Sequence, residues 1–444
     1  MVTWVAMRRK LGSMKAVFFL FICISMLYFL GIYFNDVTFL SSHFRDQDRK
    51  HLMYRWHRVA VEGFFGLRVI WPHSKLGLIL FNEGEIPNPN PNANRKFVVL
   101  VWKYWNWLKK RHVYNFGKSG GGEGLLENCS VNNCIFHGND SLIDTADAVI
   151  VHLQHGLAPK VEKRNPKQRW IFLNEEAPKN AFSLTDTKPT LKSFYNVFNW
   201  SMTYRTDSDV PVPYGRTIAL KKPVNLGYDS LYNDVARLVP NWGMKRLGKI
   251  AAVLMSNCKS QERNKFLKEL KKYVAVDVYG GCADKPELKK SCPGHFKADC
   301  DIVAEYLFYL VLENTSCFQY LTEKVFYHAY AKGAVPIIFG PTIEDVESLL
   351  PPDSYLYADS DTNIKLLAND INTLSNSSEL LLSMHMWRNH FEVVNEHGYF
   401  GSKSYHLCRV CEALNYNDPK EKVYDKYLFD SFFDPEKTCY NNYK

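Results

Sequence analysis

The sequence predicts an α/β protein with two doubly wound domains that face each other across a cleft. Short apolar runs bounded by polar or turn residues recur in two sets, as expected for buried parallel strands. Segments with helical periodicity alternate with the runs of the second set, which is typical of a doubly wound sheet. The runs are residues 97–102, 148–153 and 170–174 in the first set, and 250–255, 274–279, 307–312 and 335–339 in the second.

Three segments between the later runs are expected to be helices. Residues 261–273 place Phe266, Leu267, Leu270 and Tyr273 on one helical face. Residues 322–332 and 344–350 are also expected to be helical. A loop-rich region over residues 215–245 separates the two sets. We therefore expect domains at residues 96–240 and 241–400, followed by a cysteine-containing C-terminal segment at 401–444.

The N-terminal part has the features of a membrane anchor. Residues 16–35 carry no charged side chain and would span ~30 Å as a helix, enough for a bilayer core. Basic residues without acids precede this stretch, so the positive-inside rule leaves residues 1–15 in the cytosol and the remainder in the lumen. The long apolar run does not end in small residues, which favours an uncleaved signal anchor over a cleaved signal peptide. Residues 36–95 are expected to be a stem that ends in a Pro-Asn repeat, a stiff spacer.

The composition is that of a folded protein that does not bind nucleic acid. Apolar residues make up 46% and aromatics 14% of the 444 residues, which excludes a disordered chain. The formal charge of +9 is modest for this length, and the chain has no basic run with interleaved aromatics.

The cysteines fit an oxidising compartment. Apart from Cys23 in the apolar stretch, their number is even, so we expect disulfides whose pairing stays open. A zinc site at Cys408 and Cys411 is the alternative, although a second ligand pair is missing. The disulfide candidates are Cys129, Cys134, Cys258, Cys282, Cys292, Cys300, Cys317, Cys408, Cys411 and Cys439. The glycosylation candidates are Asn128, Asn139, Asn199 and Asn376.

The segment from Tyr320 to Lys324 predicts a nucleotide or sugar-nucleotide site. It lies between two apolar runs, where a loop should lead into a helix. Helix N-termini attract phosphate because their first amides lack intrahelical partners, and a lysine adds a full positive charge. The sequon at Asn314 lies in this region, so we expect it to be unglycosylated. Arg263, near the start of the helix at 261–273, could also grip phosphate oxygens.

Acidic residues at the end of an early strand provide a candidate general base. Glu175 and Glu176 follow the run at 170–174, and two adjacent acids on an extended chain point to opposite sides, so one should face the substrate. A second acidic pattern, Asp207-Ser208-Asp209, could hold a metal, but the neighbouring Arg205 favours a structural turn.

The chain resembles the GDP-fucose-dependent α1,3-fucosyltransferases of the Golgi. The resemblance is carried by the segments 170–178, 204–215 and 256–263 and by 312–324 with its continuation to Gly340 and Pro341. It implies two Rossmann-like domains that face a cleft in the GT-B arrangement, the first binding the acceptor and the second binding GDP-fucose, with Glu176 as the catalytic base. The donor residues that it implies are Tyr214, Ser256, Asn257, Arg263, Glu313, Asn314, Tyr320, Glu323 and Lys324.

The resemblance implies inverting transfer of fucose from GDP-β-L-fucose to a GlcNAc hydroxyl of a glycoprotein glycan. It implies a single-pass type II Golgi membrane protein that requires no metal, with manganese stimulation left open. Cys258 and the Cys408-Arg409-Val410-Cys411 segment are similar to members that act on the N-glycan core. The alternatives are a Lewis-type lactosamine acceptor, a protein hydroxyl acceptor, or a catalytically silent lumenal glycan-binding protein, which Ala177 in place of the family's frequent serine would permit.

Overall fold

The computed structural model describes residues 46–68, 74–83, 92, 94–110, 125–127, 129–224, 231–246, 248–294 and 296–440. The chain forms two units, residues 1–59 and 60–444, and both parallel sheets belong to the second. None of the helices within the described ranges is long and apolar enough to cross a bilayer. The expected anchor at residues 16–35 lies outside those ranges.

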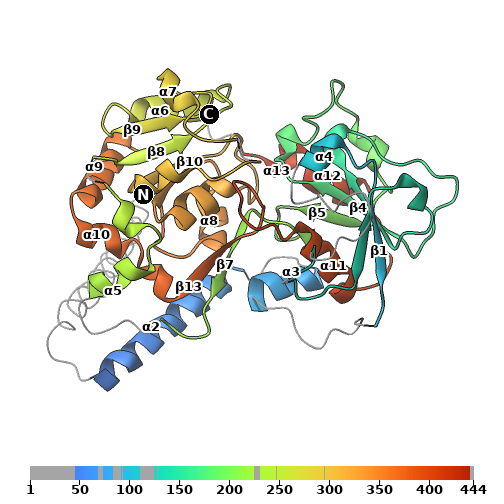
Figure 1. Ribbon diagram of the computed structural model, residues 1–444, viewed down its shortest axis with the longest axis horizontal. Helices are drawn as coiled ribbons and strands as arrows, with labels where there is room; N and C mark the ends of the chain where they lie inside the picture. The colour runs from blue at the N-terminus through green and yellow to red at the C-terminus, as the bar shows by residue number, and fades with distance from the viewer. Residues whose placement is uncertain are drawn as a thin grey trace, which may run out of the picture. The chain divides into compact units, whose positions relative to one another are not determined.

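The first sheet has six parallel strands in the order β2-β1-β3-β4-β5-β6 (Figure 1). Its strands are β1 (Phe97–Val101), β2 (Cys134–His137), β3 (Ala148–His152), β4 (Arg169–Asn174), β5 (Trp200–Thr203) and β6 (Val210–Pro211). The continuous burial of β3 and β4 explains why these strands read as uninterrupted apolar runs.

The second sheet has five parallel strands in the order β12-β11-β10-β8-β9. Its strands are β8 (Ala251–Leu254), β9 (Val276–Tyr279), β10 (Phe308–Leu312), β11 (Val335–Phe339) and β12 (Leu356–Ala358). A separate antiparallel pair joins β7 (Gly215–Ala219) to β13 (Phe391–Asn395). Two parallel sheets with helices against them confirm the α/β class predicted from the sequence.

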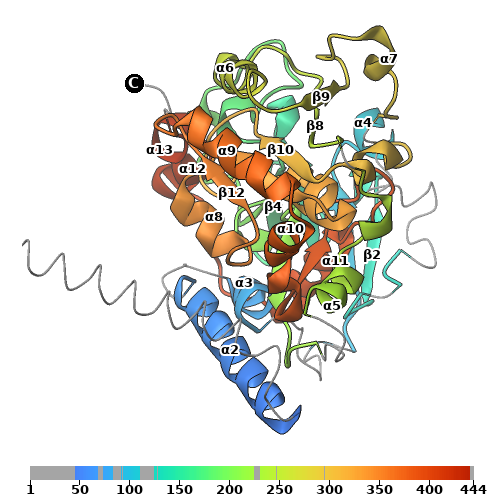
Figure 2. The same ribbon diagram turned by 90° about the vertical axis from the view of Figure 1, so that its left-hand side faces the viewer.

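Helices cover the sheets on both faces. Figure 2 shows α8, α9 and α10 in front of the second sheet, and apolar residues of α6 and α9 share one core with β8, β10 and β11. The helices are α2 (Asp46–Gly66), α3 (Lys75–Leu78), α4 (Asn106–Lys110), α5 (Leu231–Leu238), α6 (Gln261–Leu270), α7 (Pro286–Lys289), α8 (Ile343–Leu349), α9 (Ile364–Ser375), α10 (Ser378–Ser383), α11 (His406–Tyr416), α12 (Lys426–Phe433) and α13 (Pro435–Thr438).

The C-terminal segment completes the first sheet. Apolar residues of α11 pack with β1 and β2 in one core, and α12 packs with β3 and β4 in the core on the other face. Figure 1 shows the red C-terminal helices beside the green strands. Disulfides Cys129–Cys408 and Cys134–Cys411 tie α11 to this sheet, and Cys317–Cys439 ties the chain end to the second half.

The expectation of disulfides is confirmed. The remaining bridges are Cys258–Cys282 and Cys292–Cys300, so all ten cysteines among the described residues are paired. Cys408 and Cys411 bond to different partners, which rules out the alternative of a zinc site made from their thiolates.

Two local expectations were wrong, and a third segment is helical as expected but of a different helix type. The stem expected at 36–95 contains α2 and α3, and the described residues Leu76, Leu80 and Phe81 are buried in the first core, so this part is no free spacer. Tyr273 is exposed because α6 ends at Leu270, before the helical face reaches it. The helix expected at 322–332 is instead a π-helix over Lys324–Ala329 followed by a 3₁₀ turn.

Candidate active site

A pocket of about 370 Å³ lies where strands of the second sheet end, within the range of small-ligand sites. Met255 follows β8, Gly280 follows β9 and Asn314 follows β10, and all three line it. Ligands of parallel α/β sheets bind beyond the carboxyl ends of the strands, as here. Glu176, which follows β4 of the first sheet, lines the same pocket.

Arg263 brings a buried cation to this pocket from the first turn of α6. Its guanidinium donates to the carbonyl oxygens of Leu312, at 3.4 Å, and Asn257. Its Nε has no hydrogen-bond partner among the described residues. Burial lowers the pKa of Arg263, and the Glu313 carboxylate opposes that shift. An incoming anion would therefore meet an unused donor on a desolvated cation.

Lys324 also lines the pocket, as does Lys289, and is held by acidic neighbours. Its Nζ lies 2.9 Å from a carboxylate oxygen of Glu313 and 3.5 Å from one of Glu323. Burial alone would lower the pKa of Lys324, but these two carboxylates outweigh it and raise the pKa. Lys324 is therefore charged at every physiological pH.

Glu313 does not line the pocket but contacts Thr322 and Lys324, which do. Its side chain is buried, and its carboxylate accepts hydrogen bonds from the Thr322 amide at 3.0 Å and the Thr322 hydroxyl at 2.8 Å. The expectation that Glu313 contacts the donor is corrected on this point, because both of its oxygens are directed to Thr322 and Lys324.

Glu176 is well placed for general-base chemistry. The Asn174 side chain donates to the Glu176 carbonyl oxygen at 2.8 Å, which fixes the turn after β4, and the Tyr320 hydroxyl donates to the Glu176 carboxylate at 3.2 Å. Burial raises the pKa of Glu176, while Lys324 and the Tyr320 hydrogen bond oppose this shift. A carboxylate with a raised pKa is a stronger proton acceptor in its ionised form.

Tyr214 reaches the pocket from the residue before β7. Its hydroxyl donates to the Glu175 carbonyl oxygen at 3.1 Å, and its ring stacks on the His397 ring with 3.8 Å between the ring centroids. The neighbouring Gly215 is required by packing, because a Cβ there would lie 2.4 Å from the Phe326 ring of the π-helix. The Pro-Tyr-Gly segment thus brings β7 against the helix that carries Lys324.

The other expected donor residues also line the pocket: Ser256, Asn257, Asn314, Tyr320 and Glu323. Sequence reasoning missed several lining residues, among them His328, Tyr399 and Phe400. His328 is buried, neither ring nitrogen has a hydrogen-bond partner among the described residues, and burial lowers its pKa to about 4. Its position four residues after Lys324 is the signal that could have indicated it, because that spacing returns to the same helical face.

The Asp-x-Asp pattern is structural. Asp207 pairs with Arg205 at 2.6 Å, and Asp209 accepts hydrogen bonds from the Tyr424 hydroxyl and the Ser201 amide. Neither aspartate lines the pocket. These contacts are those of the structural turn that Arg205 favours.

Two glycosylation candidates are exposed and one is not. Asn139 and Asn376 lie on the surface, whereas Asn199 is buried, accepts from the Trp170 amide and donates to the Lys422 carbonyl oxygen. The prediction that Asn199 is a glycosylation site was therefore wrong, because Asn199 is a core residue. Asn128 lies outside the described residues, and Asn314 is in the pocket, as expected for an unglycosylated sequon.

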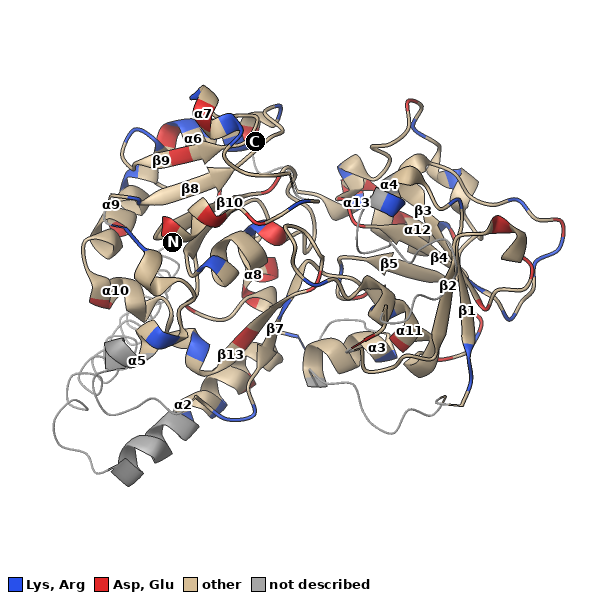
Figure 3. Ribbon diagram, viewed as in Figure 1, with Lys and Arg blue, Asp and Glu red and all other residues tan. Residues whose placement is uncertain are grey.

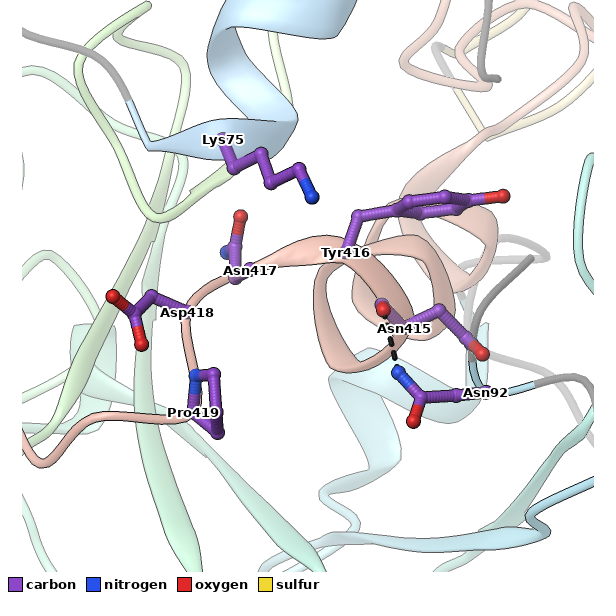
Figure 4. A pocket seen from close by; sticks show the side chains of 7 residues that line it. All are labelled: Lys75, Asn92, Asn415, Tyr416, Asn417, Asp418 and Pro419. Atoms are coloured by element: carbon purple, nitrogen blue, oxygen red, sulfur yellow. Dashed lines mark hydrogen bonds between the residues drawn. The ribbon is translucent and has the colours of Figure 1, made fainter. Parts of the chain in front are cut away.

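A second pocket, also about 370 Å³, lies beside α3 and α11, and its lining is structural (Figure 4). Asn92 donates to the Asn415 carbonyl oxygen at 2.7 Å. Asn417 accepts from the Leu76 amide and donates to the Asp209 carbonyl oxygen. Because the side-chain amides of Asn92 and Asn417 are hydrogen-bonded to neighbouring segments, they offer little to a ligand.

Charges of both signs are interspersed along the described elements (Figure 3). The cations at Arg263 and Lys324 belong to the pocket and not to an extended basic face. This distribution agrees with a small anionic ligand better than with a polyanion.

Comparison with known proteins identifies the family. Residues 94–215 match the model "Fucosyltransferase, N-terminal", and residues 244–428 match "Glycosyltransferase family 10 (fucosyltransferase) C-term". The chain is 27% identical over 365 residues to the "Alpha-(1,3)-fucosyltransferase 7" of Rattus norvegicus, covering 81% of this chain and 84% of that protein.

Two further similarities were found. The "Glycoprotein 3-alpha-L-fucosyltransferase A" of Drosophila melanogaster is 28% identical over 320 residues, covering 72% of this chain and 56% of that protein. A crystal structure of an α1,3-fucosyltransferase with GDP-fucose is 16% identical and covers 80% of this chain and 99% of that chain, with a TM-score of 0.46. Because the two matched domains fall on the two parallel sheets and the pocket residues, the chain is a glycosyltransferase and belongs to glycosyltransferase family 10, the fucosyltransferases.

Proposed function

We propose that this protein is an inverting α1,3-fucosyltransferase that moves fucose from GDP-fucose to a GlcNAc hydroxyl of a glycoprotein glycan. The observation that carries the proposal is that one pocket is lined by the carboxylate Glu176 from the first sheet and the cations Arg263 and Lys324 from the second half. The first sheet then serves as the acceptor-binding domain and the second as the donor-binding domain, in the GT-B manner.

The proposed reaction uses these groups in separate roles. Glu176 removes a proton from the acceptor hydroxyl while that oxygen attacks C1 of fucose from the face opposite the diphosphate. Negative charge grows on the departing diphosphate, and Arg263 and Lys324 stabilise it. Because both cations are preorganised and partly desolvated, little reorganisation is needed as the charge develops.

We propose the N-glycan core as the acceptor, since the Cys258 and Cys408–Cys411 segments are similar to members with that specificity. The rat and fruit-fly relatives are almost equally identical to this chain, so a direct assay must decide. The lumenal part, offered GDP-fucose with N-glycan cores and with lactosamines, should fucosylate the cores preferentially. Equal or greater transfer to lactosamines would refute the core assignment.

The same assay tests the activity and its metal dependence. Slow GDP release from GDP-fucose without acceptor is expected of an enzyme, and a silent glycan-binding protein would release none. Activity should persist in the presence of a chelator if the two cations suffice. Loss of all transfer on chelation, with recovery on adding Mn²⁺, would contradict that part of the proposal.

We also propose a type II Golgi location. Five disulfides suit an oxidising lumen, and the charge pattern around residues 16–35 suits a signal anchor. Protease protection of the folded part in sealed microsomes would test this topology, and digestion of that part from outside would exclude it.

A further inference from the structure

Glu175, the neighbour of the proposed base, is turned away from the pocket into a buried cluster with two histidines. A Glu175 carboxylate oxygen lies 2.8 Å from Nε2 of His406 and 3.2 Å from Nε2 of His397. All three side chains are buried. They come from the end of β4, the residues after β13 and the first turn of α11.

Further contacts hold this cluster in place. The Tyr214 hydroxyl donates to the Glu175 carbonyl oxygen, and the Tyr214 ring stacks on His397. On the other side, the Ser404 hydroxyl lies 2.9 Å from Nδ1 of His406. The pairing of β7 with β13 sets this arrangement, because Gly215 pairs with Asn395 and the Glu396 amide donates to the Tyr214 carbonyl oxygen.

Two histidines and one carboxylate could also be the ligands of a metal ion. The distances decide between the two interpretations. Ligand atoms ~2.0–2.1 Å from a tetrahedral zinc would lie roughly 3.3 Å apart. The 2.8 Å between Nε2 of His406 and the Glu175 oxygen is shorter than that separation, as expected of side chains in direct contact. The geometry therefore favours direct contact of the side chains.

We propose that Glu175, His397 and His406 form a positioning unit, which fixes the end of β4 so that Glu176 faces the pocket. Adjacent residues of an extended segment point to opposite sides, so anchoring Glu175 inside the first half orients Glu176 outward. The inference rests on the proposed function, because it takes Glu176 as the base. None of the three residues lines the pocket, so their effect on catalysis would be indirect.

The unit also has an electrostatic role. Burial raises the pKa of Glu176, and the charges of Glu323 and Glu175 raise it further, against Lys324 and Tyr320. His397 and His406 face Glu175 and offset its charge.

The other titratable groups near the histidines have partners of their own or lie further away. Tyr399 lies 4.5 Å from the His397 ring, measured between ring centroids. The neighbouring Glu396 is paired with Arg216 at 2.6 Å and with Arg409 at 2.8 Å.

Replacing the carboxylate and replacing a histidine of this unit should shift the pH profile of kcat/KM in opposite directions. Glu175→Gln removes a negative charge and should move the acid limb of the kcat/KM profile to lower pH. His406→Ala leaves that charge less compensated and should move the limb to higher pH. It should also reduce kcat about 10- to 100-fold, since a small displacement of the base costs this much, while the Kd for GDP stays the same.

Conservative and control variants separate positioning from general destabilisation. His406→Gln and His397→Gln keep a donor near Nε2 and should recover part of the lost kcat. His385→Gln changes a buried histidine elsewhere in the second half and should leave the pH profile unchanged. If His406→Ala does not fold, the shift of Glu175→Gln and the partial recovery in His406→Gln still test the proposal.

Three results would overturn it. His406→Ala with the parent's kcat and pH profile would remove the positioning role. Acid limbs that shift in the same direction in Glu175→Gln and His406→Ala would remove the electrostatic role. A stoichiometric metal found by elemental analysis, whose removal reproduces His406→Ala, would replace the unit with a metal centre. A Glu176→Gln variant measured in parallel isolates the proposed function, because full activity there would refute the base itself.

Discussion

The Tyr320 hydroxyl donates a hydrogen bond to the Glu176 carboxylate at 3.2 Å, and this bond joins the loop after β10 to the turn after β4. The two residues are 144 positions apart in the chain. A proposed base is thereby held by a residue of the half that carries the cations. The hydrogen bond also stabilises the ionised carboxylate and so opposes the rise of its pKa that burial causes.

Replacing Tyr320 by Phe should move the acid limb of the kcat/KM profile to higher pH. The base acts only when ionised, so activity falls as pH drops through its pKa, and loss of the Tyr320 donor raises that pKa. Rates measured between pH 5 and 9 would show the shift. Tyr330→Phe, at a buried tyrosine bonded to Ser354, is the control and should leave the limb in place. A shift to lower pH would contradict the assigned role.

Glu176→Gln should reduce kcat by about 10²–10⁴-fold, the range for loss of a general base. The amide keeps the size of the side chain but accepts no proton, so GDP binding should survive. Transfer rates together with calorimetric titration of GDP would separate the two effects. Glu379→Gln, on the exposed first turn of α10, provides the control. Retention of the parent turnover would exclude Glu176 as the base.

Lys324→Met should weaken GDP binding, because it removes a cation from the pocket. Combining it with Glu313→Gln avoids leaving a buried carboxylate without its cation. Loss of a hydrogen bond to a charged group costs about 1.5–3 kcal/mol, which corresponds to a Kd about 10- to 100-fold higher. The comparison is with Glu313→Gln alone and with Lys365→Met, at an exposed position of α9. An unchanged Kd would mean that Lys324 does not contact the diphosphate.

Removing the Cys317–Cys439 bridge by serine substitution should lower the free energy of unfolding by about 2–5 kcal/mol. This bridge spans 122 residues, and the entropy that a crosslink removes from the unfolded chain grows with the enclosed loop. The Cys292–Cys300 bridge spans 8 residues and should matter less. Thermal unfolding of both double variants would check the order. A larger loss for the short loop would show that the unfolded-chain term does not dominate.

Asn199 should carry no glycan when the protein is made in a secretory host, whereas Asn139 and Asn376 should be occupied. The Asn199 side chain is buried and its amide nitrogen is bonded to Lys422, so a glycan cannot be accommodated in the folded chain. Site-resolved glycopeptide mass spectrometry would measure occupancy. Asn199→Ala should in addition cost about 1–3 kcal/mol of stability by leaving the Trp170 amide unpaired. Substantial glycan at Asn199 would contradict the buried assignment.

The strands and much of the pocket could be predicted from the sequence because both depend on local pattern. β3, β4, β10 and β11 are uninterrupted apolar runs, since both faces of these strands are buried. Polar residues just beyond the ends of such strands identified Glu176 and Asn314. Parallel strands place their carboxyl ends along one edge of each sheet, β4 in the first and β10 in the second.

Other features depend on contacts between distant segments, and no local pattern records them. His406 reaches Glu175 only because α11 returns to the first sheet. Asn199 has a sequon, but its burial follows from contacts with β4 and with Lys422. The same holds for Glu313, whose direction is set by Thr322 and Lys324 and not by its position after β10.

The return of the last helices to the first sheet bears on the biosynthesis of this chain. The cores on both faces of that sheet include residues of α11 and α12, so the half made first cannot finish folding until almost the whole chain has left the ribosome. Until then its strands would expose unpaired apolar surface of the kind that chaperones bind. A short C-terminal deletion would therefore leave both cores of the first sheet incomplete, although its strands are synthesised early. A nonsense codon near the end of the gene should then prevent folding of that sheet.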